Sequence, residues 1–155
     1  MKVLALVNGS FHSAAMVRHY TDNPLVDTVT PLFVDYGQHG RKEQKAAVQH
    51  IYEKSPWGKV RSMETFEFGN LHKDGVRPAP LRSLFLYTVA ANYAIIKNYD
   101  IIAVGKADTP VMKMMQVLLD LGRDITFEAP VSSYTPEWAH GACVKAGYDV
   151  KKLVG

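Results

Sequence analysis

The chain has 155 residues, of which 47% are hydrophobic and 21% are charged. This composition is that of a globular protein and excludes the disordered and fibrous classes; the length predicts a single domain over residues 1–155. The formal charge of +3 comes without any run of Lys and Arg, which argues against nucleic acid as a partner.

The single cysteine and the lengths of the apolar runs indicate the cellular compartment of the protein. Cys143 excludes an internal disulfide and a cysteine-rich zinc cluster, and it predicts a buried thiol in a reducing environment. No apolar run approaches the roughly 18 residues of a membrane span, and residues 3–7 are too short for a signal peptide. We therefore expect a cytoplasmic protein with no membrane partner.

The first half of the chain alternates between predicted strands and helices. A short apolar run predicts a buried strand over residues 3–7, and helix formers follow over residues 13–20. β-branched residues predict a second strand over residues 28–34, and helical spacing predicts a helix over residues 41–54. Alternating polarity predicts a third strand over residues 59–66.

The second half continues the alternation. Residues 70–80 carry Gly75, Pro78 and Pro80 and form an irregular stretch of the kind that often crosses a site. After it, the sequence predicts a heavily buried helix over 81–99, a strand over 100–105, a helix over 111–121, a strand over 125–128 and a helix over 135–146, the last one capped by Thr135 with Pro136 in its first turn.

This order predicts an α/β, Rossmann-like fold, with a parallel sheet of about five strands and helices on both faces. In such a sheet the ligand lies beyond the carboxyl ends of the strands, where the strand order reverses. Three segments compete for the site: residues 8–13, 35–40 and 105–108.

The first of these segments joins a strand to the start of a helix. Its residues Asn8, Gly9, Ser10, His12 and Ser13 can direct backbone N–H groups and a helix dipole at an anion. The alternative is an ordinary tight turn in which His12 or Ser13 caps the helix. His12 is then either a phosphate donor or a helix-start residue.

A second motif, taken together with this loop, resembles a known protein family. The string Asp35-Tyr36-Gly37-Gln38 ends the second predicted strand. Together with the first loop it resembles the 7-cyano-7-deazaguanine synthases of the queuosine pathway, members of the ATP pyrophosphatase (PP-loop) superfamily, in which these places read Ser-Gly-Gly-x-Asp-Ser and Asp-Tyr-Gly-Gln. The later segments Leu84-Phe85-Leu86 and Glu128-Ala129-Pro130 extend the resemblance over nearly the whole chain.

The resemblance implies a HUP-type three-layer sandwich that holds ATP or AMP with magnesium. Main-chain groups of the first loop would take the pyrophosphate, and groups at the end of the second strand would receive the adenine and ribose. An enzyme of this family activates a carboxylate as its adenylate, and ammonia then displaces AMP. We predict these nucleotide- or phosphate-binding residues, with no catalytic residue and no protein metal ligand assigned: Asn8, Gly9, Ser10, His12, Ser13, Val34, Asp35, Tyr36, Gly37, Arg82, Gly105 and Lys106.

Several positions depart from the family pattern. Asn8 stands in place of serine, Ser10 in place of the second glycine, and His12 in place of the acidic residue. A side chain at Ser10 hinders close approach to phosphate, and histidine cannot replace a carboxylate that manages magnesium. The family's Arg-Asn pair reads Leu81-Arg82 here, so that Arg77 or Arg82 would face a phosphate.

The family's substrate segment has no counterpart here beyond Asp108 and Pro110. With one cysteine, the chain cannot form the family's four-cysteine zinc site, so we expect no zinc. Two functions follow. The first is a catalytically impaired protein that binds a nucleotide or small anion, or that acts through a homodimer or another protein partner. The alternative is an active ATP-dependent adenylating enzyme of deazapurine metabolism.

Overall fold

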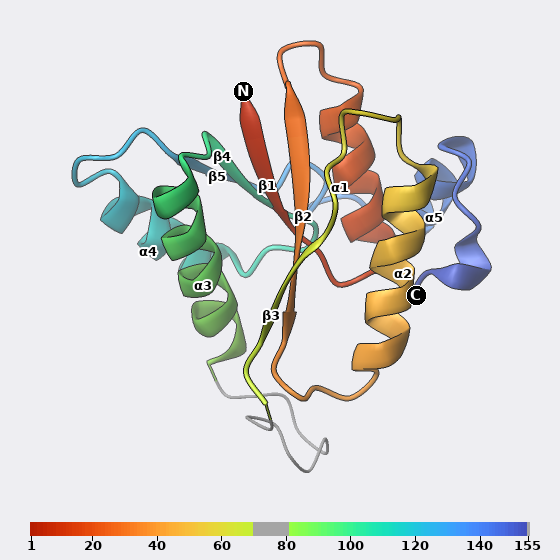
Figure 1. Ribbon diagram of the computed structural model, residues 1–155, viewed down its shortest axis with the longest axis horizontal. Coiled ribbons are helices and arrows are strands. Elements are labelled where there is room, and N and C mark those ends of the chain that lie inside the picture. Colours follow the sequence, from red (N-terminus) through yellow and green to blue (C-terminus); the bar gives the residue numbers. More distant parts are fainter. Residues whose placement is uncertain (70–80, 155) are drawn as a thin grey trace.

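The computed structural model describes residues 1–69 and 81–154. Within them, parallel strands form one sheet in the order β3-β2-β1-β4-β5 (Figure 1). The strands are β1 (Lys2–Leu6), β2 (Thr28–Asp35), β3 (Glu64–Glu67), β4 (Ile101–Val104) and β5 (Thr126–Glu128). All four neighbouring pairs are parallel.

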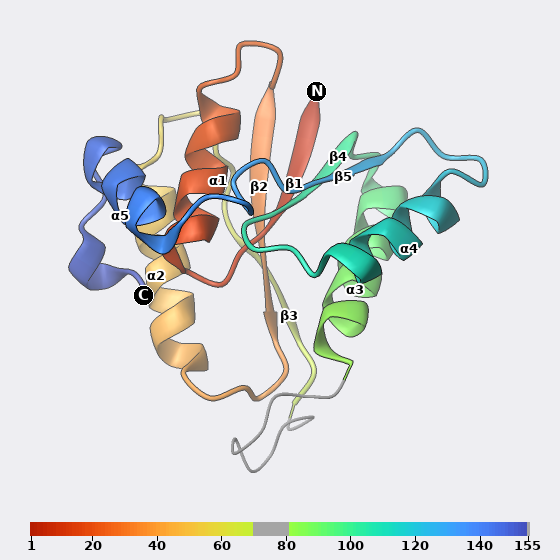
Figure 2. The same cartoon turned by 180° about the vertical axis from the view of Figure 1, so that it is seen from behind.

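Helices cover both faces of this sheet. They are α1 (Phe11–Thr21), α2 (Arg41–Lys54), α3 (Arg82–Lys97), α4 (Thr109–Leu119) and α5 (Pro136–Lys145), followed by a short 3₁₀ helix (Val150–Lys152). Helices α1, α2 and α5 lie on one side, and α3 and α4 lie on the other (Figures 1 and 2). The predicted α/β Rossmann-like, HUP-type three-layer sandwich is therefore confirmed.

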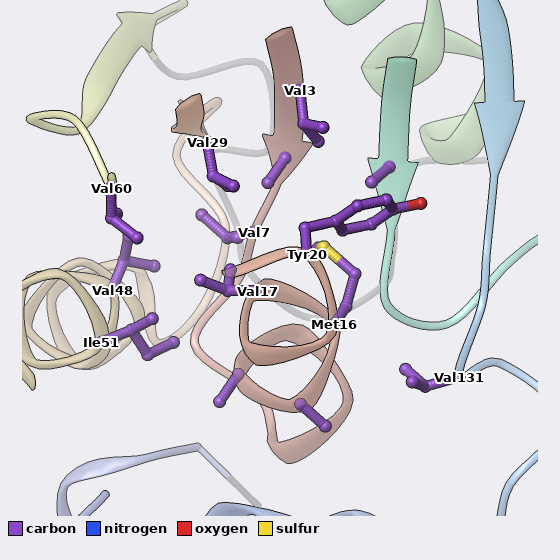
Figure 3. Packing of buried hydrophobic residues seen from close by; sticks show 14 of the residues in the cluster. Val3, Val7, Met16, Val17, Tyr20, Val29, Val48, Ile51, Val60 and Val131 are labelled. Atoms are coloured by element: carbon purple, nitrogen blue, oxygen red, sulfur yellow. The ribbon is translucent and has the colours of Figure 1, made fainter. Parts of the chain in front are cut away.

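Alternating side chains of the central strand supply both layers of the core. Val3 and Ala5 point to the layer that contains α1 and α2, whereas Leu4 belongs to the layer under α3 and α4. Figure 3 shows the first layer, in which Met16 and Val17 of α1 pack beneath the sheet. A strand buried on both faces reads as a continuous apolar run, which explains why β1 was predictable.

The third strand is shorter than predicted. The prediction spans residues 59–66, but the strand occupies Glu64–Glu67. Val60 makes only an isolated bridge to Val29, and β3 then pairs with β2 from Leu32 to Asp35. Burial does not alternate over residues 60–66, and residues 61–63 connect the Val60 bridge to β3 without continuous pairing.

The prediction of a heavily buried helix over residues 81–99 is wrong in its burial. Helix α3 buries Tyr87, Ala90, Ala91 and Ala94, whereas Ile96 is 73% exposed. The helix lies on the outside of the sheet, so only one side of it can reach the core.

Other helix ends follow the expected local chemistry, with one difference. Thr135 caps α5 by accepting a hydrogen bond from the Trp138 N–H, and Pro136 stands in the first turn. Asp108 caps α4 in the same way, so this helix begins two residues earlier than predicted. Cys143 is fully buried, as expected, and burial raises the pKa of its thiol to about 11. Among the described residues, no helix is long and apolar enough to cross a membrane.

Candidate functional site

A cleft of about 170 Å³ opens at the carboxyl edge of the sheet. Residues after β1, β2 and β4 line it, together with the first turns of α3. Helix α1 follows β1 onto one face of the sheet, whereas α4 follows β4 onto the other (Figures 1 and 2). This divergence between two neighbouring strands is where the fold favours a ligand.

The first loop is closed by its own side chains. Asn8 Oδ1 accepts hydrogen bonds from the Ser10 N–H at 3.0 Å and from the Ser13 hydroxyl at 2.9 Å. Ser13 Oγ accepts from the Asn8 N–H, and Ser10 Oγ accepts from the Ser13 N–H. Ser10 is therefore the cap of α1, and the expectation that His12 or Ser13 caps it is wrong. A phosphate must displace these bonds to reach the N–H groups of Asn8, Ser10 and Ser13.

Close packing holds the loop from outside. Gly9 has a φ of +81°, and a Cβ there would lie 2.5 Å from the Ala47 Cβ of α2. A Cβ on Gly105 would lie 2.7 Å from the Ser13 nitrogen, so the end of β4 fits directly against the first turn of α1. The Val154 N–H donates to the Gly9 carbonyl at 2.9 Å. These contacts explain why both positions need glycine.

The end of β2 is also internally satisfied. The buried Gln38 amide donates to the Val34 carbonyl at 3.0 Å and accepts from the Tyr36 N–H at 2.9 Å. It also donates to Gln44 Oε1. An adenine edge that donates and accepts in this place would have to replace the Gln38 side chain.

The charged side chains that line the cleft are positive. Arg82 and Lys106 line it, and no carboxylate of the described residues does so. Lys106 Nζ donates to the Ser132 carbonyl at 2.9 Å, which leaves two of its three donors. Arg82 is the first residue of α3, a helix that no side chain among the described residues caps. The cation and the positive end of the helix dipole therefore act at the same place.

Tyr87 adds a neutral donor to this wall. Its hydroxyl oxygen accepts a hydrogen bond from the Asp108 N–H at 2.9 Å, and the ring lines the cleft. Burial is the main cause that raises the pKa of Tyr87, so the hydroxyl keeps its proton at neutral pH. The Asp108 N–H holds the Tyr87 hydroxyl oxygen in place. The hydroxyl can therefore donate its proton in a hydrogen bond to a ligand oxygen.

The structure brings some of the predicted site residues together and not others. Those that line the cleft are Asn8, Ser13, Val34, Tyr36, Arg82, Gly105 and Lys106. Gly9, Ser10, His12, Asp35 and Gly37 do not line it. Arg77 and the irregular stretch 70–80 lie outside the described residues.

The residues away from the cleft have structural partners. His12 is 8% exposed, and its Nε2–H donates to the Tyr134 carbonyl at 2.9 Å. Asp35 accepts from the Gly37 N–H and lies 3.9 Å from Arg41 Nη1. The contact of His12 matches the alternative in which it belongs to the helix start. Asp35 closes its own turn.

Sequence reasoning missed four polar residues of the lining: Gln38, Gln44, Ser83 and Tyr87. Gln38 was part of the motif that carried the resemblance, so its signal was present. Ser83 directly follows Arg82 on the same helix turn. Tyr87 is buried on the apolar side of α3, and nothing in the sequence separates it from ordinary core aromatics.

The residues present fit a phosphate anion better than a magnesium–ATP complex. Among the described residues, no group of three or more His, Cys, Asp or Glu side chains could hold a metal ion. The carboxylate of the second motif, Asp35, accepts a hydrogen bond within its own turn.

Comparison with known proteins identifies the fold. No protein-family model matches the chain, and no curated protein matches it. Among solved structures, it is similar to the U34-tRNA thiolase NcsA from Methanococcus maripaludis, determined with its 4Fe–4S cluster, with a TM-score of 0.64 and 15% sequence identity. The similarity covers 96% of this chain, which spans 58% of the thiolase chain. A likeness at this identity establishes a shared fold and not a shared activity.

Proposed function

We propose that this protein is a catalytically impaired relative of the PP-loop enzymes that binds a nucleoside monophosphate or another small anion in the cleft. The observation that carries the proposal is the pairing of Arg82 and Lys106 in a cleft whose described lining has no carboxylate. Two cations attract a phosphate without a metal ion, and Arg82 offers it a planar, fork-shaped set of donors.

Two further observations support this proposal. The solved neighbour is a PP-loop tRNA thiolase, which agrees with a fold used for nucleotide chemistry. The self-closed first loop then argues against a pyrophosphate-cleaving role, because three of its N–H donors already have partners. A single phosphate on the opposite wall, near Arg82, avoids that conflict.

The alternative is an active adenylating enzyme of deazapurine, queuosine-pathway metabolism. The Asp35-Tyr36-Gly37-Gln38 string favours it, and the fold is shared with a tRNA-modifying enzyme. This activity needs magnesium to neutralise charge that develops on the leaving pyrophosphate, and no acidic side chain of the first loop provides for it.

Calorimetry with ATP, AMP and pyrophosphate, each with and without magnesium, separates the two functions. The proposal expects AMP to bind equally well without magnesium, and it expects no release of AMP from ATP. Tight, magnesium-dependent ATP binding together with AMP release would establish the enzyme instead. If none of the three anions binds, the cleft has no nucleotide function.

A further inference from the structure

Helix α4 exposes a stripe of large apolar side chains. Met114 is 46% exposed, Val117 63%, Leu118 52% and Leu121, just beyond the helix, 75%. The adjacent side of the helix is already used, because Met115 and Leu119 lie about 100° round the helix axis from Met114 and Leu118 and are buried in the core. In Figures 1 and 2, α4 lies at the periphery of the molecule, on the side of the sheet that it shares with α3.

The spacing of these residues makes the stripe continuous. Positions i, i+3, i+4 and i+7 fall on one face of a helix, so the four side chains of this α4 stripe form one ridge about two turns long. The core-facing positions Met115 and Leu119 show the same spacing on the side next to it. A helix whose apolar surface extends well beyond its core-facing side is typical of one that packs against two partners, and the described residues supply only one.

The charges beside the stripe identify the second partner. Lys113 and Asp120 are seven residues apart, which places them on the same flank of the helix, two turns from each other. Lys113 makes no ion pair with any described residue. Asp120 accepts one hydrogen bond, from Gln116 Nε2 at 2.8 Å, and a carboxylate retains further acceptor sites.

This flank is complementary to itself when two copies of the helix meet antiparallel. Around a two-fold axis between Val117 and Leu118, the Met114 end of one stripe faces the Leu121 end of the other. Identical flanks then face each other, and Lys113 lies less than one turn along the axis from Asp120 of the second copy. The symmetry repeats this ion pair, as in any isologous interface.

We propose that the α4 stripe is a homodimer seam, occupied by α4 of a second copy of this chain in antiparallel orientation. A stripe of four large side chains is small beside the roughly 20–30 residues per side of a standard interface. The dimer is therefore weak and depends on protein concentration. The seam is separate from the cleft lining, so it stands independently of the anion-binding function.

Sedimentation velocity over a range of protein concentrations tests the seam. The wild type is expected to shift reversibly from monomer to dimer, and Val117→Glu is expected to weaken the dimer by at least about tenfold because it places a charge in the seam. Leu25→Glu is the matched control, because Leu25 is 70% exposed but lies outside α4. Its dimerisation should equal that of the wild type.

A charge exchange tests the orientation. Lys113→Glu and Asp120→Lys should each weaken the dimer, and the double variant should restore it, because the interchain pairs form again with reversed signs. A wild type that stays monomeric at every concentration overturns the proposal, as does a dimer that Val117→Glu leaves unchanged. Failure of the double variant to restore dimerisation, with circular dichroism showing intact folding, overturns the antiparallel pairing.

Discussion

Two helix N-termini reach the cleft, and they differ in almost every property that matters for an anion. The start of α1 is capped by Ser10, closed by Asn8 and covered by Gly105. The start of α3 has no side-chain cap among the described residues and places the Arg82 guanidinium at the cleft. The first has the position of a phosphate loop, whereas the second has the available charge. The helix start that occupies the usual place of a phosphate loop is therefore not the one that is best able to bind an anion in this molecule.

The largest expected effect comes from disturbing the fit at α1. Gly105→Ala places a Cβ against the backbone of His12 and Ser13, at 2.8 and 2.7 Å, and backbone cannot move aside as a flexible side chain can. We expect the free energy of unfolding to fall by about 3 kcal/mol, measured by urea denaturation.

Gly141→Ala is the control for this prediction. Gly141 lies inside α5 and has an ordinary φ, and a Cβ built there meets no described atom within 4 Å other than its chain neighbours and the helix's own backbone. Alanine should raise the stability by roughly 0.5–1 kcal/mol at this helical position. An unchanged stability for Gly105→Ala would mean that β4 and α1 are not in close contact, and the closed loop would lose its main support.

At α3 we expect a loss of binding without a loss of stability. Arg82→Gln removes a charged partner worth about 1.5–3 kcal/mol, so the dissociation constant for AMP should rise about 10- to 100-fold. The unfolding free energy should change by less than about 0.5 kcal/mol, because Arg82 is exposed.

Arg61→Gln provides the matched control for charge. Arg61 is also exposed, but it lines a hollow together with Lys2 and Thr28, at the start of β1 and β2. Loss of AMP binding in Arg61→Gln to the same extent as in Arg82→Gln would show that general charge, and not the α3 terminus, attracts the anion.

A smaller effect should appear when the first loop is opened. Ser10→Gly removes the oxygen that occupies the Ser13 N–H, and glycine at a helix cap costs only a few tenths of a kcal/mol. We expect pyrophosphate to bind up to about tenfold more tightly, since a freed N–H can donate to it. Isothermal calorimetry measures this change. Unchanged or weaker pyrophosphate binding would show that self-closure is not what excludes the anion.

The smallest effect concerns the segment that covers the loop. His50 Nε2 accepts a hydrogen bond from the Asp149 N–H at 2.9 Å, near the segment whose Val154 contacts Gly9. Burial, and secondly the Lys152 cation, lower the pKa of His50 from its usual 6.5. As the pH falls below about 6.5, the unfolded chain takes up the proton first, so the contribution of His50 to the free energy of unfolding should decline progressively.

His50→Gln separates this contribution from that of other groups. Glutamine keeps an acceptor for the Asp149 N–H but does not titrate, so the decline in stability between pH 7 and pH 5 should be shallower than in the wild type. Thermal denaturation at each pH measures it. Parallel pH profiles for the two proteins would contradict the role given to His50.

The sequence predicted the fold well because its strongest signals are local. The run around Leu4 and the run around Ile102 are buried on both faces, and Thr135 with Pro136 marks a helix start that needs no tertiary information. The burial of α3 was overestimated because the apolar side chain of Ile96 is left exposed by tertiary arrangement alone.

The candidate site was less predictable because its chemistry depends on long-range contacts. The sequence indicated that Ser13 and Gly105 lie near each other only because it predicted the fold. It did not indicate that the Ser10 hydroxyl accepts a hydrogen bond from the Ser13 N–H. The bond between His12 and the Tyr134 carbonyl joins residues 122 positions apart. Hydrogen-bond partners at such separations decide whether a donor is available to a ligand.

The most direct test of the central claim is the dissociation constant for AMP with and without magnesium, measured by calorimetry on the wild type. If Arg82 and Lys106 supply the positive charge, the dissociation constant for AMP is the same with and without magnesium. Binding then weakens as the salt concentration rises. A constant that falls sharply when magnesium is added would contradict the account, because a metal ion would then supply the charge that we assign to these two side chains.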